Sequence, residues 1–123
     1  LPPASLRSAG MVGFYGTGDI FAIADALLGL PDDALGGVFD GNPARHGTLV
    51  RGLPVRPPAE AAASSCACVV LCTQAAEAAM RRALTDAGFR GRIIGFNEIL
   101  EAVCDEASDR QGVHRLVGAH GAE

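Results

Sequence analysis

The sequence predicts an α/β domain built on a parallel β-sheet of about five strands, with helices on both faces. Two observations support this prediction. Short apolar runs alternate with stretches of helical spacing, and glycines and prolines separate them. The chain has 123 residues, of which 49% are hydrophobic and 20% charged, which suits one globular domain. We expect this domain to span residues 11–107, between a linker at residues 1–10 and a polar tail at residues 108–123.

The first half of the chain predicts two strands with a helix between them. Residues 11–15 form an apolar run that ends abruptly at a glycine, as is typical of a buried parallel strand. Residues 20–30 then carry apolar side chains at helical spacing, until a glycine and a proline stop the pattern. Residues 35–39 form the second strand, which ends at the four turn-forming residues 40–43.

The second half predicts the remaining strands and their helical connections. Residues 47–55 contain glycines, branched residues and Pro54, which indicates a hairpin-like excursion or a short edge strand. With residues 53–55 counted as the third strand, the predicted strand order is 3-2-1-4-5. The other predicted elements are two helical turns at residues 58–65, a strand at 67–72, a helix at 74–87, a strand at 92–96 and a helix at 99–107.

The segment between the first strand and the first helix is typical of a phosphate-binding turn. Gly16 permits a tight turn, and Gly18 lets the backbone approach a diphosphate closely. The helix that begins near Asp19 and Ile20 directs free amide groups and the positive end of its dipole toward that anion. The Thr17 hydroxyl would add a hydrogen bond. This pattern predicts a nucleotide site of the Rossmann type.

The glycine pattern is incomplete, because Phe21 stands where a dinucleotide fingerprint has its third glycine. Its bulk should push the helix away from the strand, so Gly16 and Gly18 are also open to interpretation as a plain strand-to-helix turn. A second feature favours the nucleotide: Asp40 ends the second strand 22 residues after Gly18, near the separation expected for an acid that binds ribose hydroxyls. An aspartate before Gly-Asn-Pro is equally typical of an ordinary turn.

Further contacts are expected around Asp40 and at the end of the fourth predicted strand. The Asp40 charge should disfavour a 2′-phosphate, and Arg45 would reverse that preference by pairing with the phosphate. Thr73 and Gln74 end the strand expected beside the first one, where the strand order reverses and opens a crevice. The predicted nucleotide-binding set is Gly16, Thr17, Gly18, Asp19, Ile20, Asp40, Gly41, Asn42, Arg45, Thr73 and Gln74.

Three segments carry a resemblance to a known class of domain: Gly16-Thr17-Gly18, residues 38–47 (VFDGNPARHG) and Gly52-Leu53-Pro54-Val55. They resemble the N-terminal Rossmann-like domain of bacterial sugar acyltransferases and of CapD-type polysaccharide-biosynthesis proteins, over about residues 11–96. The resemblance implies a UDP-sugar or an NAD-type ligand, within a larger sugar-modifying protein. Many relatives have a second acid where this chain has Gly41, which leaves the specificity for ribose or base open.

Composition and missing motifs narrow the function classes. The formal net charge of −4 gives no positive field for phosphate backbones, so we expect no nucleic-acid partner. The chain has no apolar run of the roughly 18 residues that would span a bilayer, so we expect a cytoplasmic protein. Neither a hexapeptide-repeat helix nor a Tyr-x-x-x-Lys pair is present, which favours a binding domain over an enzyme.

The cysteines and histidines are interpreted as structural or solvated residues. Cys66, Cys68 and Cys72 lie in or beside an apolar segment and are predicted to be buried thiols rather than metal ligands. The three histidines, His46 among them, lie in predicted loop or tail segments. Two functions stay open: a nucleotide-binding module of a larger protein, or a ligand-free structural or oligomerisation domain that pairs subunits.

Overall fold

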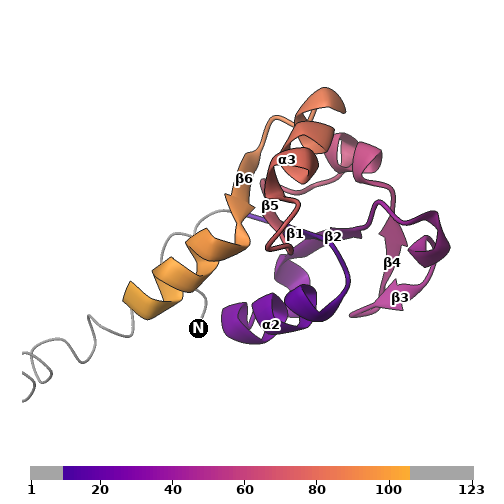
Figure 1. The fold of residues 1–123 in the computed structure, drawn as a ribbon. Helices are drawn as coiled ribbons and strands as arrows, with labels where there is room; N and C mark the ends of the chain where they lie inside the picture. Colours follow the sequence, from indigo (N-terminus) through magenta and orange to yellow (C-terminus); the bar gives the residue numbers. More distant parts are fainter. Residues whose placement is uncertain (1–9, 106–123) are drawn as a thin grey trace, which may run out of the picture.

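A six-stranded β-sheet in the order β3-β4-β2-β1-β5-β6 forms the centre of the computed structural model, which describes residues 10–105 (Figure 1). All neighbouring strands are parallel except β3, which pairs antiparallel with β4. The predicted order 3-2-1-4-5 is confirmed, with β4 as the third predicted strand, and β3 is an additional edge strand. The strands are β1 (Val12–Tyr15), β2 (Leu35–Phe39), β3 (Leu49–Val50), β4 (Leu53–Arg56), β5 (Cys68–Leu71) and β6 (Arg92–Gly95).

The additional strand exists because a tight turn folds the chain back at Arg51 and Gly52. Both residues have positive φ angles, 51° and 79°, as a two-residue hairpin of right-handed twist requires. The Arg51 guanidinium donates hydrogen bonds to Asp25 Oδ1 at 2.9 Å and to the Leu30 carbonyl oxygen at 3.0 Å. The hairpin is thereby tied to the last turn of α2 (Asp19–Leu28) and to the segment that follows it.

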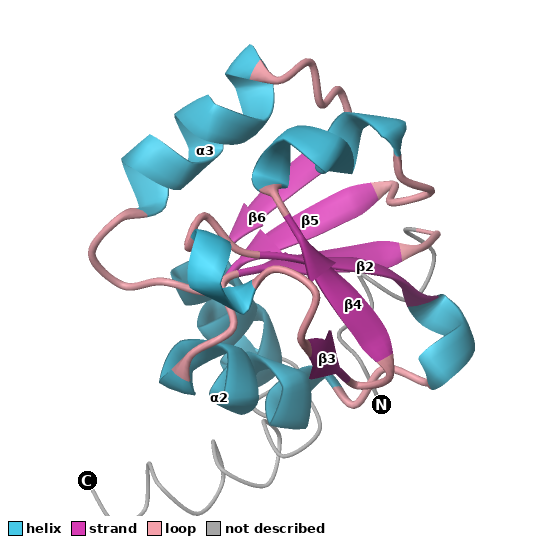
Figure 2. Ribbon diagram, turned by 90° about the vertical axis from the view of Figure 1, so that its right-hand side faces the viewer, coloured by secondary structure: helices cyan, strands magenta, loops and turns pink. Residues whose placement is uncertain are grey.

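Helices cover both faces of the sheet, as predicted (Figure 2). On one face, α2 (Asp19–Leu28) and a helix at residues 96–105 pack over a core that includes Phe14, Val70 and Ile94. On the other face, α3 (Glu77–Asp86) and the 3-10 helix η3 (Pro58–Ala63) cover a second core. Two short 3-10 helices, η1 (Asp32–Ala34) and η2 (Pro43–Arg45), lie in the connections before and after β2.

Strands β1 and β5 lie at the middle of this arrangement, and every residue in both strands is buried. Such strands are expected to be apolar on both faces, which explains their continuous apolar sequence. Cys66, Cys68 and Cys72 are buried free thiols. Burial raises the pKa of the Cys68 thiol to about 11 and that of Cys72 to about 12.

Some boundaries differ from the prediction for local reasons. Helix α3 begins at Glu77 rather than Gln74, because the Thr73 hydroxyl accepts hydrogen bonds from the Ala75 amide at 3.3 Å and the Ala76 amide at 3.0 Å. These bonds hold the segment in a turn. The last helix begins directly after β6, earlier than predicted, and its Glu98 carboxylate accepts a hydrogen bond from the Gly95 amide at 3.0 Å.

The predicted linker, apart from Gly10, and the polar tail at residues 108–123 lie outside the described residues, as do the last two residues of the helix predicted at 99–107. Within residues 10–105, no helix combines the length and the hydrophobicity that crossing a bilayer requires.

Candidate functional site

Gly16 begins the turn after β1, and both its backbone conformation and its close neighbours require glycine at this position. Its φ is +109°, a conformation that L side chains rarely adopt. Its amide donates a hydrogen bond of 2.7 Å to the Phe39 carbonyl oxygen at the end of β2. A Cβ at this position would lie only 2.9 Å from the Cys72 carbonyl oxygen. The turn is therefore fitted between the carboxyl ends of β2 and β5.

Gly18 differs from Gly16, because nothing in the fold requires it to be glycine. Its φ and ψ are −90° and −150°, an extended conformation with a negative φ, and a Cβ there would meet no atom within 4 Å. Gly18 is the N-cap of α2, and no side chain caps the helix start by a hydrogen bond. The first amides of a helix have no intrahelical partner and attract anions. Open space therefore faces backbone donors at this point.

Asp40 follows β2 and is joined directly to the glycine turn. Its Oδ2 accepts hydrogen bonds from the Thr17 amide at 3.1 Å and from the Thr17 hydroxyl at 2.6 Å. Its Oδ1 accepts one from the Asn42 amide at 2.8 Å. Partial burial favours a raised pKa for Asp40, but these bonds and the nearby charge of Arg45 outweigh it and lower the pKa overall. The carboxylate is charged and lies against the turn.

Two further side chains hold the loop after Asp40. The Arg45 guanidinium donates a hydrogen bond of 3.2 Å to the Thr17 carbonyl oxygen, so the loop contacts the turn a second time. His46 Nε2 lies 2.6 Å from the Asp40 carbonyl oxygen. The interpretation of His46 as a solvated loop residue is thus wrong: it is half-buried against the backbone of the acid. The fold of the loop, which residue spacing does not indicate, brings it there.

Phe21, at the position of the third glycine, lies in the core instead of in the turn. Its side chain is buried, and its ring packs edge-on against Phe14 of β1, with ring centres 5.1 Å apart. The helix and the strand are thus joined by an aromatic pair where glycine would allow direct backbone packing. The space at Gly18 stays clear of the Phe21 side chain.

The structure does not draw every predicted residue into one cluster. Ile20 is half-buried and packs against the core below α2, and Asp19 is exposed at the helix start. Thr73 lies just beyond β5, but its hydroxyl is occupied by its own loop. Gln74 is exposed, and no hydrogen bond links it to the turn or to Asp40 within the described part of the chain. The residues brought together are Gly16, Thr17, Gly18, Asp40, Asn42 and Arg45.

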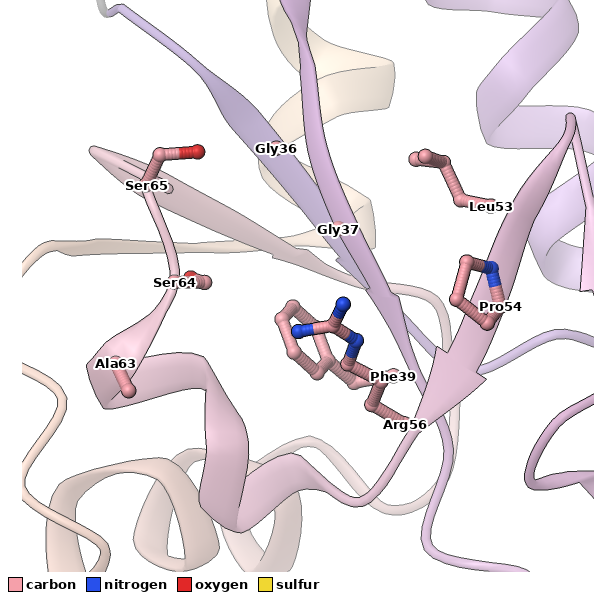
Figure 3. A pocket seen from close by; sticks show the side chains of 9 residues that line it. All are labelled: Gly36, Gly37, Phe39, Leu53, Pro54, Arg56, Ala63, Ser64 and Ser65. Atoms are coloured by element: carbon pink, nitrogen blue, oxygen red, sulfur yellow. The ribbon is translucent and has the colours of Figure 1, made fainter.

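A cavity of about 290 Å³ lies elsewhere, on the sheet face that η3 and α3 cover (Figure 3). Arg56 points into it, but it pairs with Glu60 at 3.9 Å, and the Ser64 hydroxyl is bonded to the Ala61 carbonyl oxygen at 2.6 Å. These two polar side chains are thus paired within the fold, and we consider the turn the stronger candidate. The cavity is lined by Gly36, Gly37, Phe39, Leu53, Pro54, Arg56, Ala63, Ser64 and Ser65, none of which was predicted as a site residue.

No protein-family model matches the sequence, and no curated protein matches it. Solved structures do match. RSP, a Rex-family repressor, shares 17% identity over 91% of this chain and 65% of its own, with a TM-score of 0.53. RSP in complex with β-NADH shares 18% identity over 91% of this chain and 66% of its own, also with a TM-score of 0.53. The likeness shows a Rossmann-like fold, and the chain spans less than two thirds of the first repressor structure.

The comparisons correct one expectation from the sequence and leave another without support. A third match, RSP in complex with β-NAD⁺ and operator DNA, has 19% identity over 89% of this chain and 61% of that chain, with a TM-score of 0.50. The exclusion of nucleic acid was therefore wrong. Net charge describes only these 123 residues, and it carries no information about other parts of a longer protein. The resemblance to sugar acyltransferases and CapD-type proteins finds no support among these matches.

Proposed function

We propose that this chain is the nucleotide-binding module of a longer protein and that its ligand is NAD, as NAD⁺ or NADH. The observation that carries the proposal is the contact between Asp40 and the glycine turn, with bonds of 2.6 and 3.1 Å to Thr17. The contact supports the proposal because it would place ribose hydroxyls, bound by Asp40, beside a diphosphate bound by the turn, and these are adjoining parts of one dinucleotide. RSP, which has the same fold, has been crystallised with β-NADH and with β-NAD⁺.

Different residues would bind different parts of the ligand. The backbone at Gly18 and the first amides of α2 would bind the diphosphate, which the helix dipole also favours. A carboxylate has about four acceptor positions, and three of those on Asp40 are occupied by Thr17 and Asn42. One ribose hydroxyl would take the fourth position. A second hydroxyl would displace the Thr17 hydroxyl from Oδ2.

The charge at Asp40 supports NAD over NADP. Its lowered pKa keeps the carboxylate ionised at neutral pH, and a 2′-phosphate beside it would be repelled. Arg45 is the one predicted group that would offset this repulsion, and its guanidinium is bonded to the Thr17 carbonyl oxygen. We therefore expect NADP⁺ to bind more weakly than NAD⁺.

Calorimetric titration of the chain with NAD⁺, NADH, NADP⁺ and UDP-glucose tests the proposal. UDP-glucose belongs in the series because it also contains a ribose and a diphosphate, and the sequence resemblance implied a UDP-sugar. We expect NAD⁺ or NADH to bind with a submillimolar Kd and UDP-glucose to bind more weakly. If none of the four binds the folded chain below millimolar concentration, the ligand-free structural domain becomes the better interpretation.

Gly18→Val is the matching variant, because a side chain there has open space in the free protein and would occupy the diphosphate position in the complex. It should fold normally and lose binding. Ala26→Val, at an exposed position further along α2, should fold and bind like the unmodified chain. Equal binding by both variants would contradict the position of the site.

For the longer protein we propose a DNA-binding regulator that responds to NAD. The support is the match of 91% of this chain to a structure described as a Rex-family repressor, and the description of a related complex with operator DNA. Selection of genomic DNA fragments by the full-length protein, with and without NADH, tests this role. Recovery of no enriched fragment in either condition would refute it and leave the NAD proposal for this module intact.

A further inference from the structure

Tyr15 occupies the last position of β1, directly before the glycine turn. The chain has one tyrosine and no tryptophan, so any tyrosine signal from this protein comes from this residue. The Tyr15 side chain is 6% exposed and packs in the core beside Phe39 and Leu71, on the face that α3 covers. Its body is therefore fixed by packing.

The Tyr15 hydroxyl has no role in that core. It makes no hydrogen bond within residues 10–105, and no polar side-chain atom in this part of the chain is sealed away without a partner. The oxygen thus reaches the surface. A Cβ built at Gly41 would lie 3.8 Å from the hydroxyl oxygen, which places the hydroxyl beside the loop that follows Asp40.

We propose that the Tyr15 hydroxyl is a ligand contact that donates a hydrogen bond to an acceptor atom on the heterocyclic base of the nucleotide. The missing side chain at Gly41 leaves the hydroxyl uncovered. The inference rests on the proposed function, since it adds a base contact, at the loop that follows Asp40, to the diphosphate position at Gly18 and the ribose position at Asp40. The chemical class bound there is a base with a ring nitrogen or a carbonyl oxygen on its edge.

The surroundings of Tyr15 keep its hydroxyl protonated, and therefore able to donate a hydrogen bond. Burial, and then the negative charge of Asp40, raise the pKa of Tyr15 above its ordinary value, so the phenol stays protonated at neutral pH. The Asp40 carboxylate already accepts three hydrogen bonds, so the neutral Tyr15 hydroxyl is left to donate its proton to another acceptor. An acceptor on a bound base would receive it.

Two variants test the contact as a pair. Tyr15→Phe keeps the ring and removes the oxygen. Gly41→Val should cover the oxygen without straining the backbone, because Gly41 is not among the glycines with positive φ. We expect Tyr15→Phe to weaken NAD⁺ binding by roughly 2- to 12-fold, the range of one net hydrogen bond. Gly41→Val should weaken it comparably alone, and add little in the Tyr15→Phe background.

Calorimetry on the four proteins, with unfolding curves for each, gives the answer. A purely structural Tyr15 would leave NAD⁺ affinity unchanged in Tyr15→Phe, which would overturn the inference while the proposed function stands. If the unmodified chain binds neither NAD nor UDP-glucose, the proposed function fails, and this inference fails with it.

Tyrosine fluorescence of the unmodified chain is a second readout that needs no variant. We expect NAD⁺ to change the emission of Tyr15, after correction for absorption by the ligand, with the same Kd as in calorimetry. Binding that leaves the emission unchanged would also count against the contact, even if Tyr15→Phe failed to fold.

Discussion

Replacing each glycine of the turn with alanine should separate its folding role from its binding role. At Gly16 the φ is +109°, and the new Cβ would lie 2.9 Å from the Cys72 carbonyl oxygen. The backbone strain alone costs about 1–3 kcal/mol. The contact adds to this, because a backbone carbonyl in a strand connection cannot rotate away as a side chain would. At Gly18 the φ is −90° and the Cβ meets nothing within 4 Å, so the stability should change by no more than about 0.5 kcal/mol.

Thermal unfolding followed by circular dichroism measures the difference. In a domain of this size a loss of about 2 kcal/mol lowers the Tm by roughly 8–16 °C. Gly16→Ala should show a decrease of that order, whereas Gly18→Ala should unfold within a few degrees of the unmodified protein. In a titration with NADH, Gly18→Ala should bind about tenfold more weakly, a loss of ~1.4 kcal/mol, because its Cβ enters the space of the diphosphate.

The interpretation requires that Gly16→Ala lowers the Tm and that Gly18→Ala lowers the affinity for NADH. A Gly16→Ala protein with unchanged Tm would show that the close approach to Cys72 does not constrain the turn. A Gly18→Ala protein that binds NADH as tightly as the unmodified chain would show that the ligand lies elsewhere.

Three further predictions concern charged residues. The pKa of Asp40 is lower in the folded than in the unfolded chain, so its stabilising effect is full at neutral pH and is lost as the pH falls through the folded pKa. Denaturant unfolding should find Asp40→Asn less stable than the unmodified chain at pH 7 and nearly equal to it in strong acid. Asp19 lies exposed in the first turn of α2, and Asp19→Asn should strengthen NADH binding about two- to fivefold in low-salt calorimetry, because a negative charge there repels a diphosphate. Arg51→Ala should cost about 1–3 kcal/mol in urea unfolding, because the bonds to Asp25 and Leu30 are lost.

Each of these has its own control. A stability difference between Asp40→Asn and the unmodified chain that grows on acidification would reverse the assigned direction of the pKa shift. An Asp19→Asn gain that persists unchanged in high salt would not be electrostatic. Arg51→Lys keeps the charge and a side chain at the positive φ, but lacks the planar fork; full stability in that variant would show that the geometry of the guanidinium is not required.

The order of the sheet could be predicted because its central strands are buried on both faces and appear in the sequence as unbroken apolar runs. The hairpin-like excursion predicted at residues 47–55 is present as the antiparallel pair β3–β4, but β3 could not be predicted as a strand of its own, since Leu49 and Val50 form no separate apolar run. Their pairing depends on a turn in which an arginine adopts a positive φ, and no residue preference indicates that.

The candidate site divides in the same way. Gly16, Gly18 and Asp40 could be selected by their spacing, because the turn and the acid after the next strand are set by the topology of parallel strands. Tyr15 was not predicted as a site residue, because its proposed contact depends on where one hydroxyl points and on the absence of a side chain at Gly41. The Thr17 hydroxyl was predicted to bind the diphosphate, but in the free protein it already donates its hydrogen bond to Asp40.

The most direct test of the nucleotide site is an NMR titration of ¹⁵N-labelled protein with NADH, in which every backbone amide is followed at once. We predict that the largest changes fall on the amides of residues 16–20, with smaller ones at Asn42. Changes that cluster instead around Gly36, Gly37 and Ser65, at the cavity under η3, or no change at all at millimolar NADH, would contradict the proposal that the start of α2 binds the diphosphate.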